Sequence, residues 1–305
     1  MKFIIHAPID LISPPGEFQT PEAAAEIARA IEAAGAHGTY VTEHPAPDAH
    51  WLHNDPTGHD TLDPFTSLAF LAAATKTLMV VTNVVVVPYR NPFLTAKAAA
   101  TLQVLSGGRF IFGAGTGYQV GEFEALGVPF NKRGALMDEA LERIRMAWAG
   151  GAVVKKGMNF DAKGNEPRPV PNPAPPIWIG GGSIKAVERA ARWGDGWAPF
   201  FALPTNDPNV EASSVTSIEQ LKAKYAHCQE LRAKLGKTAP FDLCIGVPAK
   251  LTPGDNGSAR AYSDKVQELA AAGVSWATVN LPGKTRAHFL DNVRWFGEEV
   301  VAKNR

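Results

Sequence analysis

Three glycines and a serine follow directly on a short apolar run in the middle of the chain. The run Ile177–Ile179 stops at Gly180, Gly181, Gly182 and Ser183, and a helical pattern of apolar residues begins at once. Glycines let backbone N–H groups approach an anion, a serine hydroxyl can donate another hydrogen bond, and a helix N-terminus favours negative charge. The segment therefore predicts a phosphate site, although a tight turn that needs small residues would use the same residue types.

Glu43 and His44 stand at the end of a second apolar segment, 38–42. The ordinary pKa of histidine suits proton transfer near neutral pH, so His44 is our candidate acid or base. Neighbouring residues on a strand point to opposite faces. If Thr42 and His44 face inward, Glu43 faces the surrounding helices. We therefore expect His44 to be the acid or base nearest the reaction, and Glu43 to contribute to the same step less directly. The alternative for His44 is packing against a ligand or capping the loop.

A metal-dependent hydrolase is the competing class. Potential zinc ligands gather in one stretch, namely Glu43, His44, Asp48, His50, His53, Asp55, Asp60 and His59. Only the first two stand at a strand end, and the others fall on a loop rich in Pro and Asp. Barrel hydrolases take two histidines, one residue apart, from their first strand, and here that strand offers His6 alone. We therefore expect no catalytic metal, and a solvated lid in this loop.

The elements that must position these residues alternate along the chain. Apolar, β-branched runs predict strands at 3–7, 38–42, 79–87, 110–115, 177–179, 196–198, 243–247 and 276–281, with helical patterns between them. Thr20, Asp63 and Asn91 each stand directly before a proline, which is typical of a helix start. Continuous apolar strands indicate a parallel sheet. Eight strand–helix units predict a single-domain (β/α)₈ TIM barrel over 1–305, with a doubly wound open sheet as the alternative.

Two inserts, 45–62 after the second strand and roughly 149–175 before the fifth, are long enough to indicate function. The second is rich in proline and reads as an extended, stiff segment.

Composition excludes some partners. Lys+Arg and Asp+Glu are both 30, so no net positive field is available to hold nucleic acid or an anionic membrane. The apolar run 78–87 is too short for a membrane span. Cys228 and Cys244 show no metal or redox spacing, which predicts reduced, buried thiols. No leader pattern precedes the first strand, and we expect a cytoplasmic protein.

The active site of such a barrel lies at the C-terminal ends of its strands. These ends collect a mostly apolar, weakly charged set, namely His6, Pro8, Glu43, His44, Asn83 to Val87, Gly115, Thr116, Gly117, Tyr118, Gly181, Gly182, Ser183, Pro199, Phe200 and Asn280. This set predicts a pocket for a flat aromatic cofactor, with one anion-binding corner and few acid or base groups.

Several motifs in order carry a family resemblance. They are Val41–His44, Thr82–Val84 with Pro88–Pro92, Ser106–Phe110 running into Gly113–Gly117, Glu122–Gly127 followed by Arg133, and Pro176–Ser183 with Gly194–Trp197. Together they resemble the bacterial-luciferase-like superfamily of flavin and deazaflavin oxidoreductases, over nearly the whole chain. The branch that the chain resembles most is the one assigned the deazaflavin coenzyme.

The resemblance implies a (β/α)₈ barrel, usually a homodimer, that binds coenzyme F420 or, as the alternative, FMN in its mouth. It implies a non-proline cis peptide at Asn83–Val84 with the ring against Val84 and Val85, and the phosphate at Gly181, Gly182 and Ser183. It implies further ring contacts from Gly115, Thr116, Gly117 and Tyr118. It also implies a catalytic acid–histidine pair, Glu43 and His44, whose histidine works near the reactive ring carbon. A separate flavin or deazaflavin reductase is an expected partner.

One residue departs from the family pattern. Sugar-phosphate dehydrogenases of the family carry a glutamate where this chain has Tyr118, which argues against a phosphosugar substrate. The aromatic residues Phe200, Phe201, Trp51 and Tyr118 favour a small apolar or aromatic substrate, or else only pack the lid. We expect hydride transfer with F420, with an FMN monooxygenase and a non-catalytic flavin-binding barrel as the alternatives.

Overall fold

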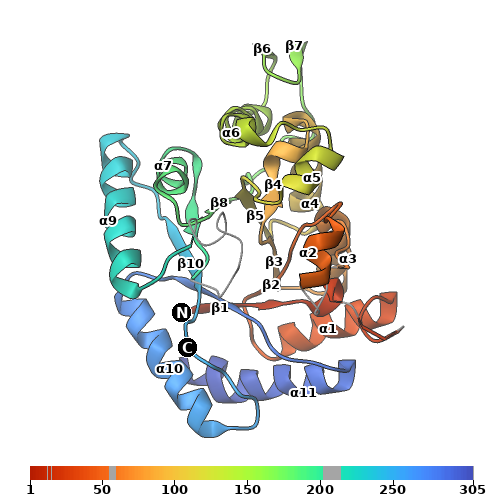
Figure 1. The fold of residues 1–305 in the computed structure, drawn as a ribbon, viewed down its shortest axis with the longest axis vertical. Helices are drawn as coiled ribbons and strands as arrows, with labels where there is room; N and C mark the ends of the chain where they lie inside the picture. The colour runs from red at the N-terminus through yellow and green to blue at the C-terminus, as the bar shows by residue number, and fades with distance from the viewer. Residues whose placement is uncertain (12, 15, 55–59, 202–213, 305) are drawn as a thin grey trace.

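Parallel strands close into a barrel, and helices surround it (Figure 1). The computed structural model describes residues 1–11, 13–14, 16–54, 60–201 and 214–304. The sheet has the order β3–β2–β1–β11–β10–β9–β8–β5–β4, and a pairing of β3 with β5 closes the ring. All its pairs are parallel. The predicted TIM barrel is confirmed, and the open sheet is excluded because the ring closes.

The elements lie close to the predicted segments. The barrel strands are β1 (Lys2–His6), β2 (Gly38–Val41), β3 (Met79–Thr82), β4 (Val85–Val86), β5 (Phe110–Gly115), β8 (Ile177–Gly180), β9 (Gly196–Ala198), β10 (Asp242–Gly246) and β11 (Trp276–Val279). The barrel helices are α1 (Pro21–Ala33), α3 (Pro64–Ala74), α4 (Pro92–Leu105), α6 (Arg133–Ala149), α7 (Ile184–Trp193), α9 (Ile218–Lys234), α10 (Asn256–Ala271) and α11 (Arg286–Phe296). Short elements are α2 (Ala49–Asn54), α5 (Val120–Ala125), η1 (Pro8–Asp10), η2 (Val87–Tyr89), η3 (Phe130–Lys132), η4 (Gly297–Val301) and η5 (Ala302–Asn304).

The helix starts follow from local sequence. The side chains of Thr20, Asp63 and Asn91 each accept a hydrogen bond from a backbone N–H in the first helical turn, as predicted. A proline occupies the first helical position in all three, where its missing N–H has no partner to lose.

Both inserts contain elements that the sequence did not predict. The first contains α2, and its residues 55–59 lie outside the described part. The second is not simply extended, because β6 (Val153–Lys156) and β7 (Asp161–Asn165) form an antiparallel hairpin that projects from the barrel (Figure 1). The predicted third strand, 79–87, is two strands, because Asn83 and Val84 leave the ladder between β3 and β4. The last strand ends at Val279 rather than at 281.

Two apolar layers hold the barrel together. The larger lies between strands and helices. The smaller lies inside the barrel and takes one residue from each strand position, namely Ile4, Tyr40, Val81, Ile111, Trp178, Ala198, Cys244 and Trp276. Side chains alternate along a strand, so the residues two positions further on also face inward. Within the strands these are His6, Gly113, Gly180, Gly246 and Thr278.

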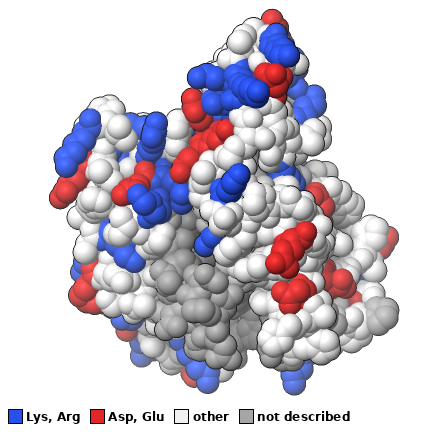
Figure 2. All heavy atoms as spheres, turned by 45° about the horizontal axis from the view of Figure 1, so that its top comes forward, with Lys and Arg blue, Asp and Glu red and all other residues white. Residues whose placement is uncertain are grey.

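Charges of both signs are mixed on the surface. On the face in Figure 2, lysines and arginines stand beside aspartates and glutamates rather than in one continuous basic area. Among the described residues, no helix has the length and apolar character needed to cross a membrane. Cys228 and Cys244 are buried and free, as predicted, and burial raises the pKa of Cys228 to about 11.

Gly113→Ala should destabilise the barrel sharply. A Cβ at Gly113 would stand 1.8 Å from the carbonyl oxygen of Thr82 on the neighbouring strand, so backbone must move. Overpacking of this kind costs about 3 kcal/mol, measurable by urea unfolding. Gly257→Ala is the control, since its new Cβ meets only the side chain of Asp255 at 3.1 Å. Equal stability of the two variants would contradict the packing described for β5.

Candidate active site

Two unlike halves make up the carboxyl-terminal mouth of the barrel. The adjacent strands β5 and β8 end in Gly115 and Gly180. Strand β10, which is separated from β8 by β9, ends in Gly246. On the opposite side, β1 ends in His6, and the Tyr40 hydroxyl donates to Asn280 Oδ1 at 2.5 Å. No side chain projects from the glycine positions, and Val84 packs directly against two of them, Gly115 and Gly180.

Val84 lies against the glycine half. The Asn83–Val84 peptide is cis, as the family resemblance implied. A Cβ added at Gly115 would stand 2.6 Å from Val84 Cγ2, and one added at Gly180 would stand 3.0 Å from Val84 Cγ1. Asn83 and Val84 are both half-buried. Val85 differs, because it is fully buried in the layer between strands and helices and turns its side chain away from the mouth.

His44 is held by a buried carboxylate. Its Nδ1 lies 3.2 Å from Glu122 Oε2 and 3.0 Å from Gln119 Nε2. Glu122 is 1% exposed and also accepts from the Tyr89 hydroxyl at 2.9 Å. Burial raises the pKa of Tyr89, reinforced by the negative charge of Glu122, so the tyrosine stays protonated and donates. A carboxylate can only accept, so Nδ1 of His44 carries a proton when it binds Glu122. The Gln119 amide nitrogen can only donate, so with this tautomer the amide must present its oxygen to Nδ1 instead.

Aromatic rings enclose His44 on two sides. The Trp51 ring, from α2, lies 4.6 Å from the His44 ring at a tilt of 33°. The Tyr118 ring lies 6.0 Å away, edge to face. The His44 side chain is 10% exposed as a result. The imidazole of His44 therefore has little contact with water.

Glu43 faces away from His44, toward the helical layer, as the strand alternation predicts. It forms an ion pair with Arg90, and its Oε2 accepts from the Val86 backbone N–H at 2.6 Å. Burial raises the pKa of Glu43, and the Arg90 charge opposes the rise. The contacts that the structure gives Glu43 fix the chain around β4, directly after the Asn83–Val84 peptide.

The glycine turn after β8 has the features of an anion site. Gly181 has φ of +94°, and the Ser183 side chain caps α7 by accepting from the Ala186 N–H at 3.2 Å. The Ser183 hydroxyl proton can still be donated. Lys224, from α9, donates to the Gly182 carbonyl at 2.5 Å, which places a cation at the turn.

Gly115, Thr116, Gly117 and Tyr118 form the loop from β5 to α5. Gly117 has φ of +75°, and a Cβ there would stand 2.6 Å from Val86 Cγ1. The loop therefore packs closely on the chain that follows the cis peptide. It delivers Tyr118, Gln119 and Glu122 to His44.

Sequence reasoning missed two residues of this site. Glu122 was visible within a family motif but had no role, because its contact with His44 spans 78 residues. Lys224 carried no local signal. It could have been found only from the barrel order, which sets α9 beside α7.

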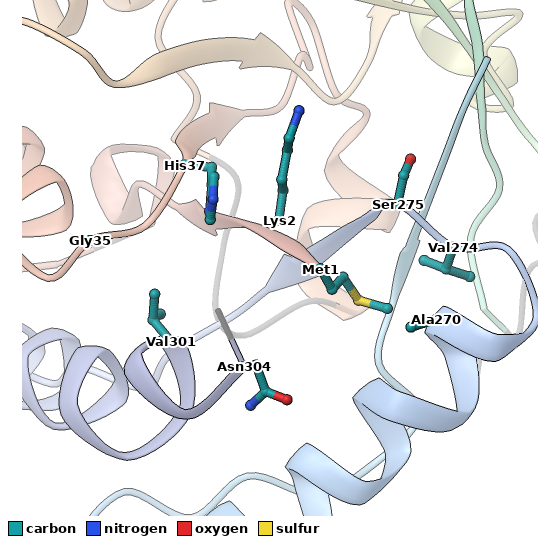
Figure 3. A pocket seen from close by; sticks show the side chains of 9 residues that line it. All are labelled: Met1, Lys2, Gly35, His37, Ala270, Val274, Ser275, Val301 and Asn304. Carbon is teal, nitrogen blue, oxygen red and sulfur yellow. The ribbon is translucent and has the colours of Figure 1, made fainter. Parts of the chain in front are cut away.

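Other groups do not form competing sites among the described residues. No group of three or more histidines, cysteines and carboxylates in the described ranges could hold a metal ion, and Asp55 and His59 lie outside those ranges. A hollow of about 660 Å³ lies at the opposite end of the barrel, between Met1, Lys2, His37 and Asn304 (Figure 3). It is formed at the strand beginnings, away from the mouth.

Comparison with known proteins agrees with this geometry. Residues 1–252 match the model of the family described as luciferase-like monooxygenase. The chain belongs to this family.

An uncharacterised protein of Mycobacterium tuberculosis is 32% identical over 188 residues, which cover 62% of this chain and 60% of the relative. An F420-dependent hydroxymycolic acid dehydrogenase of the same species is 30% identical, over 59% of this chain and 49% of that enzyme. The chain thus covers less than two thirds of these relatives.

Solved structures share the whole fold. An F420-dependent secondary alcohol dehydrogenase, in complex with an F420–acetone adduct, has a TM-score of 0.76 at 17% identity, over 100% of this chain and 99% of that one. A type II Baeyer–Villiger monooxygenase from Pseudomonas putida, in complex with FMN, has a TM-score of 0.72 at 14% identity, over 99% of this chain and 98% of that one. At these identities the likeness shows that the fold is shared with an F420-dependent and an FMN-dependent enzyme.

Glu122→Gln should change which nitrogen of His44 carries the proton. The amide of glutamine can donate to Nδ1, which favours the tautomer protonated at Nε2. Nitrogen NMR of labelled histidine reports the tautomer directly. Glu124→Gln, exposed on α5, is the matched control and should leave His44 as in the parent. An unchanged tautomer in Glu122→Gln would show that this carboxylate does not set it.

Proposed function

We propose that the chain uses coenzyme F420 for hydride transfer to or from a small, apolar or aromatic organic substrate. The observation that carries this proposal is the His44–Glu122 pair in the barrel mouth. The same mouth has a glycine half and, at the turn Gly181–Ser183, an anion site with the positively charged Lys224. The F420-dependent relatives support the deazaflavin. An FMN-dependent monooxygenase and a non-catalytic flavin-binding barrel are the outcomes that the experiments must separate.

The residues present fit a ring with a phosphate-bearing side chain. The ring would lie against Val84, whose side chain packs directly on Gly115 and Gly180 and so stands at the glycine half of the mouth. The phosphate would meet Gly181, Gly182, Ser183 and Lys224 at the start of α7. Burial lowers the pKa of Lys224, and a bound phosphate would favour its charged form.

The bound deazaflavin would supply the hydride chemistry, and the chain would supply orientation and one proton. With Nδ1 donating to Glu122, His44 exchanges a proton at Nε2. Trp51 and Tyr118 limit the access of water to this histidine. Glu43 is a positioning residue in this scheme, because it holds the Val86 amide and Arg90 rather than the mouth.

Variants of the anion corner test the cofactor site. Lys224→Met removes a cation, and a hydrogen bond to a charged group is worth about 1.5–3 kcal/mol, so affinity should fall roughly tenfold or more. Gly182→Val should cost more than Ser183→Ala, because it blocks the approach to the backbone rather than removing one donor. Ring fluorescence during titration with F420 and with FMN measures the affinity of each variant for each cofactor.

Tighter binding of F420 than of FMN supports the proposal, and the reverse favours the monooxygenase. Parent-like binding in all three variants would place the phosphate elsewhere. Lys222→Met, an exposed change on α9, is the control for the loss of a lysine.

His44→Gln and His44→Phe test the proton step. Both should retain cofactor binding and lose turnover by about 10²–10⁴-fold, the usual contribution of a positioned acid or base. Turnover is followed by F420 absorbance with a panel of secondary alcohols and ketones. Full activity in both variants would leave His44 a packing residue. Tight F420 binding without turnover in the parent on any substrate would favour the non-catalytic barrel.

We also propose that the chain works as a cytoplasmic homodimer and that a separate reductase supplies its reduced cofactor. The family resemblance supports both. Sedimentation of the purified protein tests the first, and coupled turnover with and without a reductase tests the second.

A further inference from the structure

A second histidine–carboxylate pair lies in the polar half of the mouth. His6, at the end of β1, faces inward two positions beyond Ile4. Its Nε2 lies 2.9 Å from Asp10 Oδ2, and its ring lies 5.0 Å from the ring of Tyr40. The His6 side chain is 15% exposed and Asp10 is 3% exposed. The proton step at His44 does not use this pair.

Asp10 fixes the proton of His6. Asp10 Oδ2 accepts from the Thr42 hydroxyl at 2.7 Å as well as from His6. A carboxylate has no proton to donate, so Nε2 of His6 carries the hydrogen. Nδ1 of the neutral ring is then an acceptor. Within the part of the chain that the structure describes, this nitrogen has no hydrogen-bond partner.

We propose that His6 determines substrate specificity by accepting, at Nδ1, a hydrogen bond from a hydroxyl group of the substrate. The preferred substrate is thus an alcohol with an apolar body. Asp10 is the positioning residue, since it sets the tautomer that leaves Nδ1 as an acceptor.

The layout of the mouth assigns His6 to the substrate rather than to the cofactor. The anion corner and the glycines of β5 and β8 lie across the barrel from β1, whereas β10 is separated from β1 only by β11. A cofactor anchored at Gly182 and lying against Val84 occupies that half. His6 and the Tyr40–Asn280 pair face the remaining space. This step rests on the proposed function.

Two probes of equal ring size separate donors from non-donors. Cyclohexanol has a hydroxyl, and cyclohexyl methyl ether has the same ring without a donor. Each is titrated into nitrogen-labelled protein, both without cofactor and loaded with F420. Cyclohexanol should shift the His6 Nδ1 resonance and bind about tenfold more tightly than the ether, as one hydrogen bond allows.

Two variants test the acceptor in different ways. His6→Phe removes both the N–H for Asp10 and the acceptor, whereas His6→Gln keeps an N–H for Asp10 and an amide oxygen that can accept in place of Nδ1. The preference for cyclohexanol should vanish in His6→Phe and return at least in part in His6→Gln, while F420 affinity stays unchanged in both. His288→Gln, exposed on α11, is the matched control and should keep the preference. If a variant does not fold, contacts between the His6 and Tyr40 rings assign the resonance in the parent.

An unmoved His6 resonance at the highest cyclohexanol concentration would overturn the inference, as would a preference that persists in His6→Phe. Failure of the proposed function looks different. In that case F420 would not bind, while cyclohexanol would still move the His6 resonance in the cofactor-free protein.

Discussion

The alternation of side chains along a closed parallel barrel is the constraint on which the mouth depends. Once Ile4, Trp178 and Cys244 fill the interior, the next inward positions on their strands are fixed as His6, Gly180 and Gly246. No loop rearrangement can exchange these sites, because a shift by one residue would turn every side chain of a strand to the other face. The contrast between a glycine half and a polar half is thus a property of the strands.

Three buried carboxylates hold side chains and backbone in place around the mouth. Asp10, Glu43 and Glu122 are each less than 5% exposed, and each has donors from at least two elements. Leaving a buried charge without its partner typically costs about 3–5 kcal/mol, so these arrangements are held firmly. None of the three needs to touch a ligand to matter. Two of them, Asp10 and Glu122, contact a histidine ring, and the third holds the chain after the cis peptide.

Local features could be predicted from sequence, and long-range ones could not. The caps at Thr20, Asp63 and Asn91 depend on a few neighbouring residues, and the barrel followed from repeated strand–helix units. The cis peptide at Asn83 came from family motifs, whereas the glycine turn at Gly180–Ser183 was predicted from its own residues. The cofactor, the substrate and the role of His44 stay predictions.

The missed features share a cause. Lys224 reaches Gly182 across 42 residues, and no spacing rule connects them. The hairpin β6–β7 has one β-branched pair at its start and then lysine, glycine and asparagine, a composition that a loop would share.

The two ends of the described chain meet far from the mouth. β1 pairs in register with β11, and Met1 and Asn304 line one hollow where the strands begin (Figure 3). A short linker could therefore join the ends, and new ends could be opened in a surface loop, without rerouting any strand. The same placement lets the barrel be attached to a solid support by either end with its mouth turned outward. Immobilisation and circular permutation are thus open to this scaffold by virtue of its topology.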